Sequence, residues 1–440
     1  MSWHWIDDAI FYHIYPLGMV SAPEINEGRA SEGARILEVT EWIPHLQSMH
    51  VNALYFGPVF DSHSHGYDTS DYTRTDRRLG TESDFKTVFS ALKSSGFRIV
   101  LDGVFNHVGR EFWAFRDLLL NREQSKYREW FSNVCFGEPG PAGDGFSYDT
   151  WQGHAELVKL NLSNPDVVDH LLGAVGMWMD RFDIDGLRLD AADCVDLDFF
   201  KRLKAFCRLK KPDFWLMGEI IHGDYNRYAN EEILDSTTNY ECWKGIYSSH
   251  NDRNYFEIAH SLKRQFGPNG IYSQLRLYNF LDNHDVNRIA GLLRDRRHIF
   301  NAYTLLYTMP GIPSVYYGSE WGIEGLRTQG HDADRPVRPA LKIADMLHGD
   351  TSLLSHIESL GAKRMRSEAL RSGRYEEILV KNEQYCFARS TVHESAVVML
   401  NLSDQTFSFN VSYRGKTYQS VVPPCDSVIL ISEESYHGEY

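Results

Sequence analysis

A short apolar segment that ends in charged residues constrains the fold of this chain more than any other feature. It runs from Phe182 to Asp193 and reads FDIDGLRLDAAD. Its apolar residues predict a buried β-strand, and Arg188 and Asp190 lie at the carboxyl end of that strand. Side chains two residues apart point to the same face of a strand. The segment therefore predicts either the floor of an active site or an ordinary ion pair, and both interpretations stay open at this point.

Three other segments have the same order of apolar residues first and functional polar residues last. Strands of this kind that alternate with helix-like segments are typical of βα units in a parallel sheet. When such a sheet closes into a barrel, catalytic groups gather at the carboxyl ends of the strands. Four such segments in one chain favour an active site over chance. The three segments are FRIVLDGVFNHVG at 97–109, with Asp102, Asn106 and His107; FWLMGEI at 214–220, with Glu219; and LRLYNFLDNHD at 275–285, with His284 and Asp285.

These segments carry a resemblance to a known family. The chain resembles the α-amylase superfamily of glycoside hydrolases, and within it the cyclomaltodextrinase, maltogenic amylase and maltodextrin glucosidase types. The similarity extends over roughly residues 5–440, with the motifs in the expected order. The matching motifs are DGVFNH at 102–107, LVKLNL at 157–162, GLRLDAAD at 186–193, GEI at 218–220, FLDNHD at 280–285 and GIPSVYYGSEWG at 311–322.

The composition excludes several classes of partner. With 42% hydrophobic and 24% charged residues, the chain is typical of soluble globular proteins. Its net charge of -15 argues against nucleic acid and anionic membranes, and no stretch approaches the roughly 18 apolar residues of a membrane span. The start lacks the pattern of a signal peptide, and the six cysteines form no CxxC pair. We expect a cytoplasmic protein with reduced thiols; export by another route stays open.

Two changes of pattern predict three parts in this chain of 440 residues. Residues 108–155 interrupt the βα alternation, and after about residue 350 short strands with alternating apolar residues indicate antiparallel sheets. Helical spacing predicts a helix over 36–49 that Pro44 kinks or ends early. The predicted fold is α/β: a (β/α)8 TIM barrel at 1–107 and 156–350, a small inserted subdomain after the third strand at 108–155, and a C-terminal antiparallel β-sandwich at 351–440.

The resemblance assigns roles to three acids. It implies that Asp190 is the nucleophile of a retaining, double-displacement mechanism and that Glu219 is the general acid and then the general base. It implies that Asp285 is a third acid, which holds sugar hydroxyls in the transition state. Arg188 is expected to keep Asp190 ionised by a charge-assisted hydrogen bond, and Glu219 is expected to have a raised pKa. Retaining pairs lie about 5–5.5 Å apart.

The resemblance also implies a set of substrate-binding residues. His107 and His284 match histidines that contact the sugar in the −1 subsite, although a buried histidine can also be a plain core residue. Tyr67 matches a tyrosine that stacks under that sugar. The remaining expected substrate-binding residues are Asp68 and Arg338, as a pair that closes the pocket, together with Asp334, His222 and Arg188.

The metal content and the aglycone side are less well specified. We expect no cofactor and no metal ligands. A structural calcium near Asn106 is retained as an alternative, because some amylases bind calcium there, but the insertion offers no spaced loop of oxygen ligands. After the nucleophile stand Asp193 and Cys194, and after the acid His222, where relatives have other residues. These departures leave the aglycone preference and any transglycosylation open.

The sequence therefore predicts a glycosidase that cleaves mainly α-1,4-glucosidic bonds in maltodextrins or cyclodextrins. Its expected partner is an α-glucan oligosaccharide, and the expected assembly is a monomer or a homodimer. One alternative within the superfamily is a glucanotransferase, an isomerase or a sucrose- or isomaltose-type enzyme. A more distant alternative is a non-catalytic carbohydrate-binding member, although such members typically lack a catalytic acid and all three acids are present here.

Overall fold

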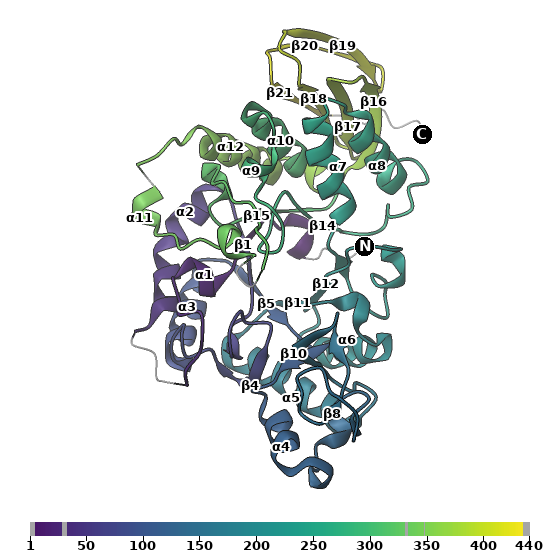
Figure 1. Ribbon diagram of the computed structural model, residues 1–440. Helices are drawn as coiled ribbons and strands as arrows, with labels where there is room; N and C mark the ends of the chain where they lie inside the picture. The colour runs from purple at the N-terminus through teal and green to yellow at the C-terminus, as the bar shows by residue number, and fades with distance from the viewer. Residues whose placement is uncertain (1–4, 29–32, 331–332, 347, 434–440) are drawn as a thin grey trace.

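The computed structural model describes residues 5–28, 33–330, 333–346 and 348–433. Eight parallel strands form its centre, in the order β13-β12-β11-β5-β2-β1-β15-β14 (Figure 1). A parallel bridge between Thr238 and Tyr278 links the two ends of this order, so the sheet closes almost completely into the predicted barrel. The strands are β1 (Phe11–Ile14), β2 (Ala53–Phe56), β5 (Arg98–Gly103), β11 (Gly186–Leu189), β12 (Trp215–Gly218), β13 (Ser236–Thr237), β14 (Tyr278–Phe280) and β15 (Ile312–Tyr316).

The barrel strands are buried on both faces, which explains their nearly continuous apolar sequences. Inside the barrel, large rings fill the end opposite the charged residues: Trp215 packs on Phe11 with ring centroids 5.3 Å apart, and Phe11 packs on Tyr278 at 5.5 Å. The barrel interior is therefore a packed core at one end, and polar side chains occupy the carboxyl ends of the strands.

Helices surround the strands as an outer layer. Thr81 and Asp84 form a reciprocal capping box at the start of α3, which satisfies backbone N–H groups of its first turn. The predicted helix over 36–49 is instead a 3-10 helix, η2 (Arg35–Trp42), followed by α2 (Ile43–Ser48); Pro44 stands in the first turn of α2, where its missing N–H costs nothing. The main outer helices are α3 (Glu82–Ser94), α5 (Pro165–Phe182), α6 (Leu197–Lys210), α7 (Tyr240–Asn251), α8 (Phe256–Phe266), α10 (Ile299–Thr308) and α12 (Ser352–Arg366).

The short elements lie mostly in the connections between strands and helices. They are η1 (Trp5–Asp8), α1 (Pro16–Met19), β3 (Phe60–Ser62), β4 (Thr69–Thr75), η5 (Ala192–Cys194), η6 (Tyr225–Arg227), α9 (Ile289–Leu292), η7 (Arg296–His298), η8 (Ser319–Trp321), η9 (Arg335–Val337), α11 (Ile343–Met346) and α13 (Glu368–Ser372).

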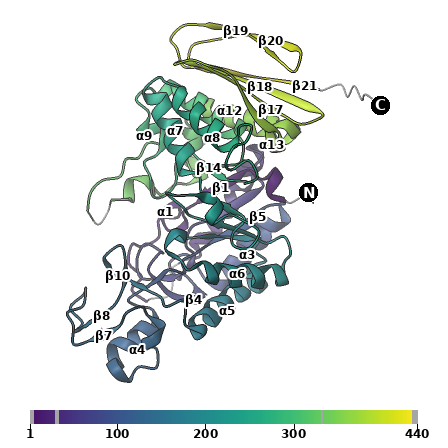
Figure 2. The same ribbon diagram turned by 90° about the vertical axis from the view of Figure 1, so that its right-hand side faces the viewer.

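The segment after the third barrel strand projects from one side of the barrel (Figure 2). It contains a three-stranded antiparallel sheet, β6-β10-β9, and a small hairpin of β7 and β8. β10 runs to Lys159, so this sheet continues past the predicted boundary at residue 155, and the division into domains stays a prediction. The elements are β6 (His107–Gly109), α4 (Trp113–Asn121), η3 (Arg122–Gln124), η4 (Arg128–Trp130), β7 (Cys135–Phe136), β8 (Phe146–Ser147), β9 (Thr150–Trp151) and β10 (His154–Lys159).

Two antiparallel sheets at the C-terminus face each other, as the predicted sandwich requires. Phe409 and Tyr418 of the smaller sheet pack in one core with Ala388 and Val397 of the larger one. The first strand of these sheets begins at Arg374, whereas the sequence predicted that the C-terminal sandwich begins at residue 351. The residues between these two positions form the helices α12 and α13. The sheets are β16-β17-β18-β21 and β19-β20, with β16 (Arg374–Val380), β17 (Gln384–Ser390), β18 (Glu394–Asn401), β19 (Phe407–Tyr413), β20 (Lys416–Val422) and β21 (Asp426–Glu433).

No helix within the described residues is both long and apolar enough to cross a membrane.

Candidate active site

The strand register brings the first polar groups together. Asp102 of β5 and Arg188 of β11 are direct partners in the parallel ladder, so their side chains point to the same face. Asp190 and Glu219 directly follow β11 and β12. Their backbone N–H groups donate to the carbonyl oxygens of Gly103 and Leu189, respectively, so the parallel ladder continues as far as these two acids. The four sequence segments therefore meet at the carboxyl end of the barrel, as the sequence predicted.

Arg188 is the centre of a buried cluster of charges. Its Nη1 atom lies 2.9 Å from Oδ1 of Asp102 and 2.9 Å from Oδ1 of Asp190, and its Nη2 atom lies 2.8 Å from Oε2 of Glu219. The guanidinium is 3% exposed, so all three contacts are largely removed from water. One arginine thus holds the two acids of the expected catalytic pair on neighbouring nitrogens.

Burial acts strongly on Asp190. It raises the pKa of this carboxyl well above its ordinary value; Arg188 opposes the shift, while Glu219 and Asp102 add to it. The expected hydrogen bond from Arg188 is present, but it does not outweigh burial and the neighbouring acids. The ionised form of Asp190 is therefore disfavoured relative to that of a free aspartic acid.

Glu219 is fixed by two further donors. The backbone N–H of Ala191 donates to Oε2 at 3.1 Å, and the Tyr240 hydroxyl donates to Oε1 at 3.2 Å. Ala191 has φ 43°, in the left-handed region that non-glycine residues rarely adopt. Strain of this kind is typical of functional sites, and here it lies between the two acids.

Asp285 is held in its charged form. Burial raises its pKa, but His284, Arg338 and Arg188 outweigh burial and hold the pKa well below the ordinary value. Its Oδ2 atom lies 2.9 Å from Nε2 of His284, and its Oδ1 atom lies 2.9 Å from Nη2 of Arg338. The surroundings of Asp190 and of Asp285 therefore push the pKa values of the two carboxyl groups in opposite directions.

Aromatic rings form a wall beside these acids. His284 lies between two tyrosine rings, with Tyr67 at 5.4 Å and Tyr15 at 5.6 Å and an interplanar angle of 6° in both pairs. The Tyr67 hydroxyl donates to Oδ2 of Asp102 at 2.9 Å and also bonds to Nε2 of His284. The hydroxyl thus ties the third barrel strand to the seventh.

His107 lies on β6, the first strand of the insertion. Its Nε2 atom is 3.9 Å from Oδ2 of Asp190. Burial, with a smaller contribution from His65, lowers the pKa of His107 to about 3, so the ring is neutral at neutral pH. The Trp151 ring, also from the insertion, lies 5.6 Å from it. The insertion therefore supplies part of this site.

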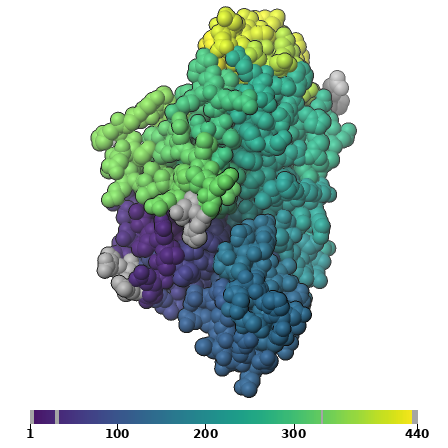
Figure 3. Space-filling model, viewed as in Figure 1, coloured from purple at the N-terminus to yellow at the C-terminus, as the bar shows by residue number. Residues whose placement is uncertain are grey.

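The remaining expected substrate residues lie at the margin of the site. Arg338 pairs with Asp285 and, at 2.9 Å, with Asp334, and it does not pair with Asp68 as the resemblance implied. Asp68 instead accepts hydrogen bonds from the backbone and hydroxyl of Ser64. His222 is exposed in the loop after β12. The segment after β15 and the insertion reach the same face of the molecule (Figure 3).

Sequence reasoning missed three tyrosines. Tyr15 stacks on His284, Tyr55 donates to Asp102 at 2.7 Å and Tyr240 donates to Glu219. Each lies in or just after a barrel element, but tyrosine in a buried strand is equally typical of plain core packing. Only their position at the carboxyl ends of strands could have indicated a role.

The acids of the insertion are engaged in other contacts. Asp144 pairs with Arg110 at 2.7 Å, Asp149 accepts from Asn133 at 2.8 Å, and Asp117 accepts from Ser125 at 2.5 Å. The side chain of Asn106 contacts His107 through its amide nitrogen at 3.2 Å, while its oxygen has no partner. Each of these three acids therefore has a partner within the insertion, and the expectation about calcium stays a prediction.

Comparison with models of protein families identifies the family of this chain. The model of the alpha amylase catalytic domain matches residues 35–351. The chain belongs to the α-amylase family. It is accordingly a glycosidase, and the family accounts for the barrel, the acids at its carboxyl end and the C-terminal sheets.

Individual relatives agree with this assignment. A cyclomaltodextrinase from a Bacillus species is 29% identical over 417 residues, which cover 90% of this chain and 73% of that protein. An intracellular maltogenic amylase from Bacillus subtilis is 29% identical over 73% of this chain and 56% of its own length. Among solved structures, the cyclic α-maltosyl-(1→6)-maltose hydrolase from Arthrobacter globiformis has a TM-score of 0.85 and 26% identity, covering 98% of this chain and 99% of that one.

Proposed function

We propose that this α-amylase family glycosidase hydrolyses mainly α-1,4-glucosidic bonds in maltodextrins and cyclodextrins and retains the anomeric configuration. The observation that carries the proposal is the position of Asp190 and Glu219 on the two terminal nitrogens of Arg188. A retaining mechanism needs two carboxyl groups about 5–5.5 Å apart, and carboxylates that share one guanidinium are held close together.

The proposed roles follow from the surroundings of each acid. Asp190 attacks the anomeric carbon and forms the covalent intermediate, while Glu219 first protonates the leaving oxygen and then activates water. For this chemistry Asp190 must be ionised and Glu219 must carry the proton when the substrate is attacked. Asp285, held ionised by His284 and Arg338, is placed to bind sugar hydroxyls and to stabilise positive charge in the transition state.

The substrate is held by the rings around the acids. Tyr67 offers a stacking face beside the −1 sugar, and His284 and the neutral His107 offer ring nitrogens to its hydroxyls. Arg338 and Asp334 lie at the rim, and Asp68 and His222 are further candidates for contacts with outer sugar units. These assignments rest on the positions described above and on the match to the family motifs.

The test combines variants with product analysis. Asp190→Asn is expected to lose nearly all turnover and to keep its fold, because an amide cannot form the ester intermediate; retention of activity within about tenfold, or about 1.4 kcal/mol in barrier, would exclude Asp190 as the nucleophile. Proton NMR of the first product is expected to show the α-anomer. Release of the β-anomer would instead establish inversion.

A second candidate substrate comes from a solved structure that matches nearly the full length of this chain. The chain and the cyclic α-maltosyl-(1→6)-maltose hydrolase cover 98% and 99% of each other, whereas the matched cyclomaltodextrinase is longer than the region shared with this chain. A small cyclic oligosaccharide with mixed linkages therefore belongs in the substrate panel. The panel is that cyclic tetrasaccharide, cyclodextrins, maltotriose, panose, isomaltose, pullulan, sucrose and starch, and transfer products would favour a glucanotransferase.

We also propose a cytoplasmic location and a monomeric or homodimeric state. All six cysteines are free in the structure, as expected for a reducing compartment, and one relative is named an intracellular enzyme. Cell fractionation tests the location, and light scattering coupled to gel filtration tests the oligomeric state.

A further inference from the structure

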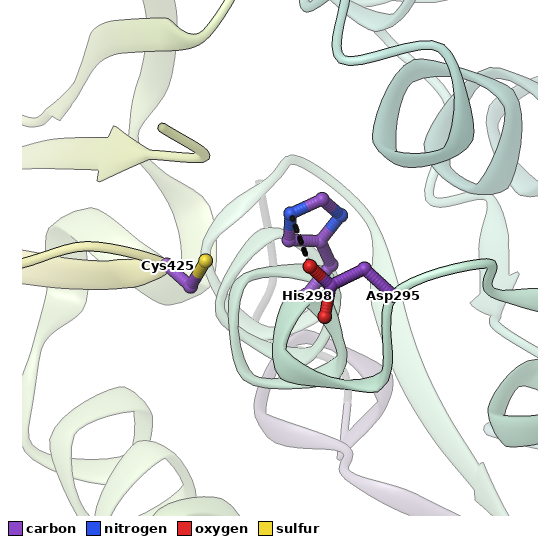
Figure 4. A group of neighbouring side chains, drawn as sticks. All are labelled: Asp295, His298 and Cys425. Atoms are coloured by element: carbon purple, nitrogen blue, oxygen red, sulfur yellow. Dashed lines mark ion pairs between the residues drawn. The ribbon is translucent and has the colours of Figure 1, made fainter. Parts of the chain in front are cut away.

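Three side chains that commonly bind transition metals converge where the segment around η7 meets the C-terminal sheets. Asp295 precedes η7, His298 ends it, and Cys425 lies in the turn between β20 and β21 (Figure 4). Their ligand atoms all lie within 4.8 Å of one another. No other group of three or more His, Cys, Asp and Glu side chains in the described part of the chain converges in this way.

The orientation of His298 is that of a metal ligand. The ring is 2% exposed, and its Nδ1 atom lies 3.1 Å from the carbonyl oxygen of His250. A carbonyl oxygen accepts, so Nδ1 carries the proton, and Nε2 presents a lone pair. Nε2 is buried without a hydrogen-bond partner and lies 3.8 Å from Oδ2 of Asp295. Two electron-pair donors thus face each other. Oδ2 of Asp295 also accepts from Nη2 of Arg297 at 2.5 Å, whereas a metal ion on Nε2 would give the buried nitrogen the partner that it lacks.

The hydrogen bond from Nδ1 of His298 to a backbone carbonyl oxygen is also typical of a metal-binding histidine. Such a bond fixes the tautomer and the ring orientation of the ligand. Two ligand atoms each about 2.1 Å from a tetrahedral metal lie roughly 3.4 Å apart. The 3.8 Å between His298 and Asp295 needs only a small contraction to reach that value.

Cys425 completes the donor set from the other part of the fold. Its thiol is buried and makes only long contacts, 3.8 Å to the carbonyl of Leu402 and 4.0 Å to that of Ser403. The residue has φ 54°, a conformation in which glycine or asparagine is usual. A cysteine that turns its sulfur inward at such a position is a candidate thiolate ligand.

The local charges match a divalent ion. Asp295 pairs with Arg297, Arg297 pairs with Asp404, and Asp404 pairs with Arg253, which in turn pairs with Glu383. Three carboxylates against two guanidinium groups leave one negative charge, and ionisation of the Cys425 thiol adds a second. A doubly charged cation would neutralise the cluster.

We propose that Asp295, His298 and Cys425 bind a zinc ion, with water as the fourth ligand, and that this ion links η7 of the barrel to the β20–β21 turn of the C-terminal sheets. Imidazole and thiolate donors select zinc over magnesium or calcium, and three protein ligands with one open position suit its tetrahedral geometry. Asp295 is 29% exposed, which provides a route for the ion to enter.

The first test measures binding with zinc and cobalt. Chelator-treated wild-type protein is titrated with zinc against a chromophoric chelator, alongside Cys425→Ser, His298→Asn and, as a matched control in the insertion, Cys135→Ser. We expect one zinc per chain for wild type and Cys135→Ser, and at least tenfold weaker binding for the other two. Cobalt is expected to give a sulfur-to-metal charge-transfer band that Cys425→Ser lacks. Equal zinc affinity in wild type and Cys425→Ser would overturn the proposal.

The second test does not depend on the folding of the variants. Native wild-type protein is treated with iodoacetamide with and without zinc, and the labelled cysteines are mapped by peptide mass spectrometry. We expect zinc to slow the labelling of Cys425 at least tenfold, and to leave the labelling of the exposed Cys135 and Cys194 unchanged. Equal labelling of Cys425 in both samples would exclude a metal–thiolate bond.

Discussion

The Nη1 atom of Arg188 lies 2.9 Å from Oδ1 of Asp190, and burial still raises the pKa of that carboxyl well above its ordinary value. Close contact with a cation therefore does not guarantee a low pKa when two more acids share the same cation. Because the raised pKa disfavours the ionised form that the proposed nucleophile needs, ionising Asp190 in the folded protein reduces the stability of the fold.

Asp190→Asn should make the protein more stable, by an amount that grows with pH. In wild type the raised pKa means that the folded state binds this proton more tightly than the unfolded chain. Stability is therefore lost as pH rises from the ordinary carboxyl pKa through the raised folded value. The variant has no proton to lose. Urea unfolding at several pH values between 4 and 9 measures the difference, and a gain that shrinks with rising pH would contradict the assignment.

Arg188→Met should destabilise the fold strongly. It leaves Asp102, Asp190 and Glu219 buried without their cation, and breaking a buried pair in this way costs about 3–5 kcal/mol. Arg188→Lys, which keeps one charge, should recover part of the loss but little activity, since a single ammonium cannot hold both acids. Chemical unfolding measures the change in stability, and kcat/KM measures the change in activity. A loss below about 1 kcal/mol in the methionine variant would show that the cluster is not held by this cation.

Tyr67→Phe and Tyr55→Phe form a matched pair. Each removes one hydroxyl that donates to Oδ2 of Asp102, and a hydrogen bond to a charged group contributes about 1.5–3 kcal/mol. Only Tyr67 also contacts His284. Similar losses of stability are therefore expected, with a larger fall in kcat/KM for Tyr67→Phe, on the order of tenfold or more. An equal effect of both variants on kcat/KM would assign Tyr67 a purely structural role.

Arg338→Met should shift the acid limb of the activity profile. Burial raises the pKa of Asp285, and Arg338 is one of the cations that reverse this effect. Without Arg338 the pKa of Asp285 rises, so protonation begins at a higher pH and activity at low pH falls. Arg338→Lys keeps the charge and should shift the limb less. The profile of kcat/KM against pH measures this, and coincident acid limbs in wild type and Arg338→Met would show that Asp285 does not set them.

The specificity constant should level off at about three or four glucose units. The contacts around Tyr67, His107, His284 and Asp334 form a few subsites, and remote subsites are what long substrates exploit. A second copy that adds a wall to the pocket would sharpen the same trend. The measurement is kcat/KM for maltose through maltoheptaose with soluble starch. Values that still rise steeply at seven units, with starch as the best substrate, would indicate an endo-acting α-amylase.

The sequence by itself determined the class of fold and the order of its parts. Burial of a parallel strand on both faces requires a continuous apolar run, and the polar residue that follows must then lie at the carboxyl end of the barrel. Asp102, Asp190, Glu219 and Asp285 could be placed in this way because each position depends only on its own segment.

Tertiary structure alone decided which of these groups touch. Arg188 reaches Glu219, 31 positions later, and Tyr15 stacks on a histidine near the seventh strand; no local pattern records contacts between such distant segments. Helix α12 was missed for a different reason, since its buried residues Leu353, Ile357 and Leu360 recur at helical spacing; a local signal was present and was not used. The raised pKa of Asp190 is likewise a property of the tertiary structure. It depends on how far several segments together exclude water, and burial cannot be assigned to any one of them.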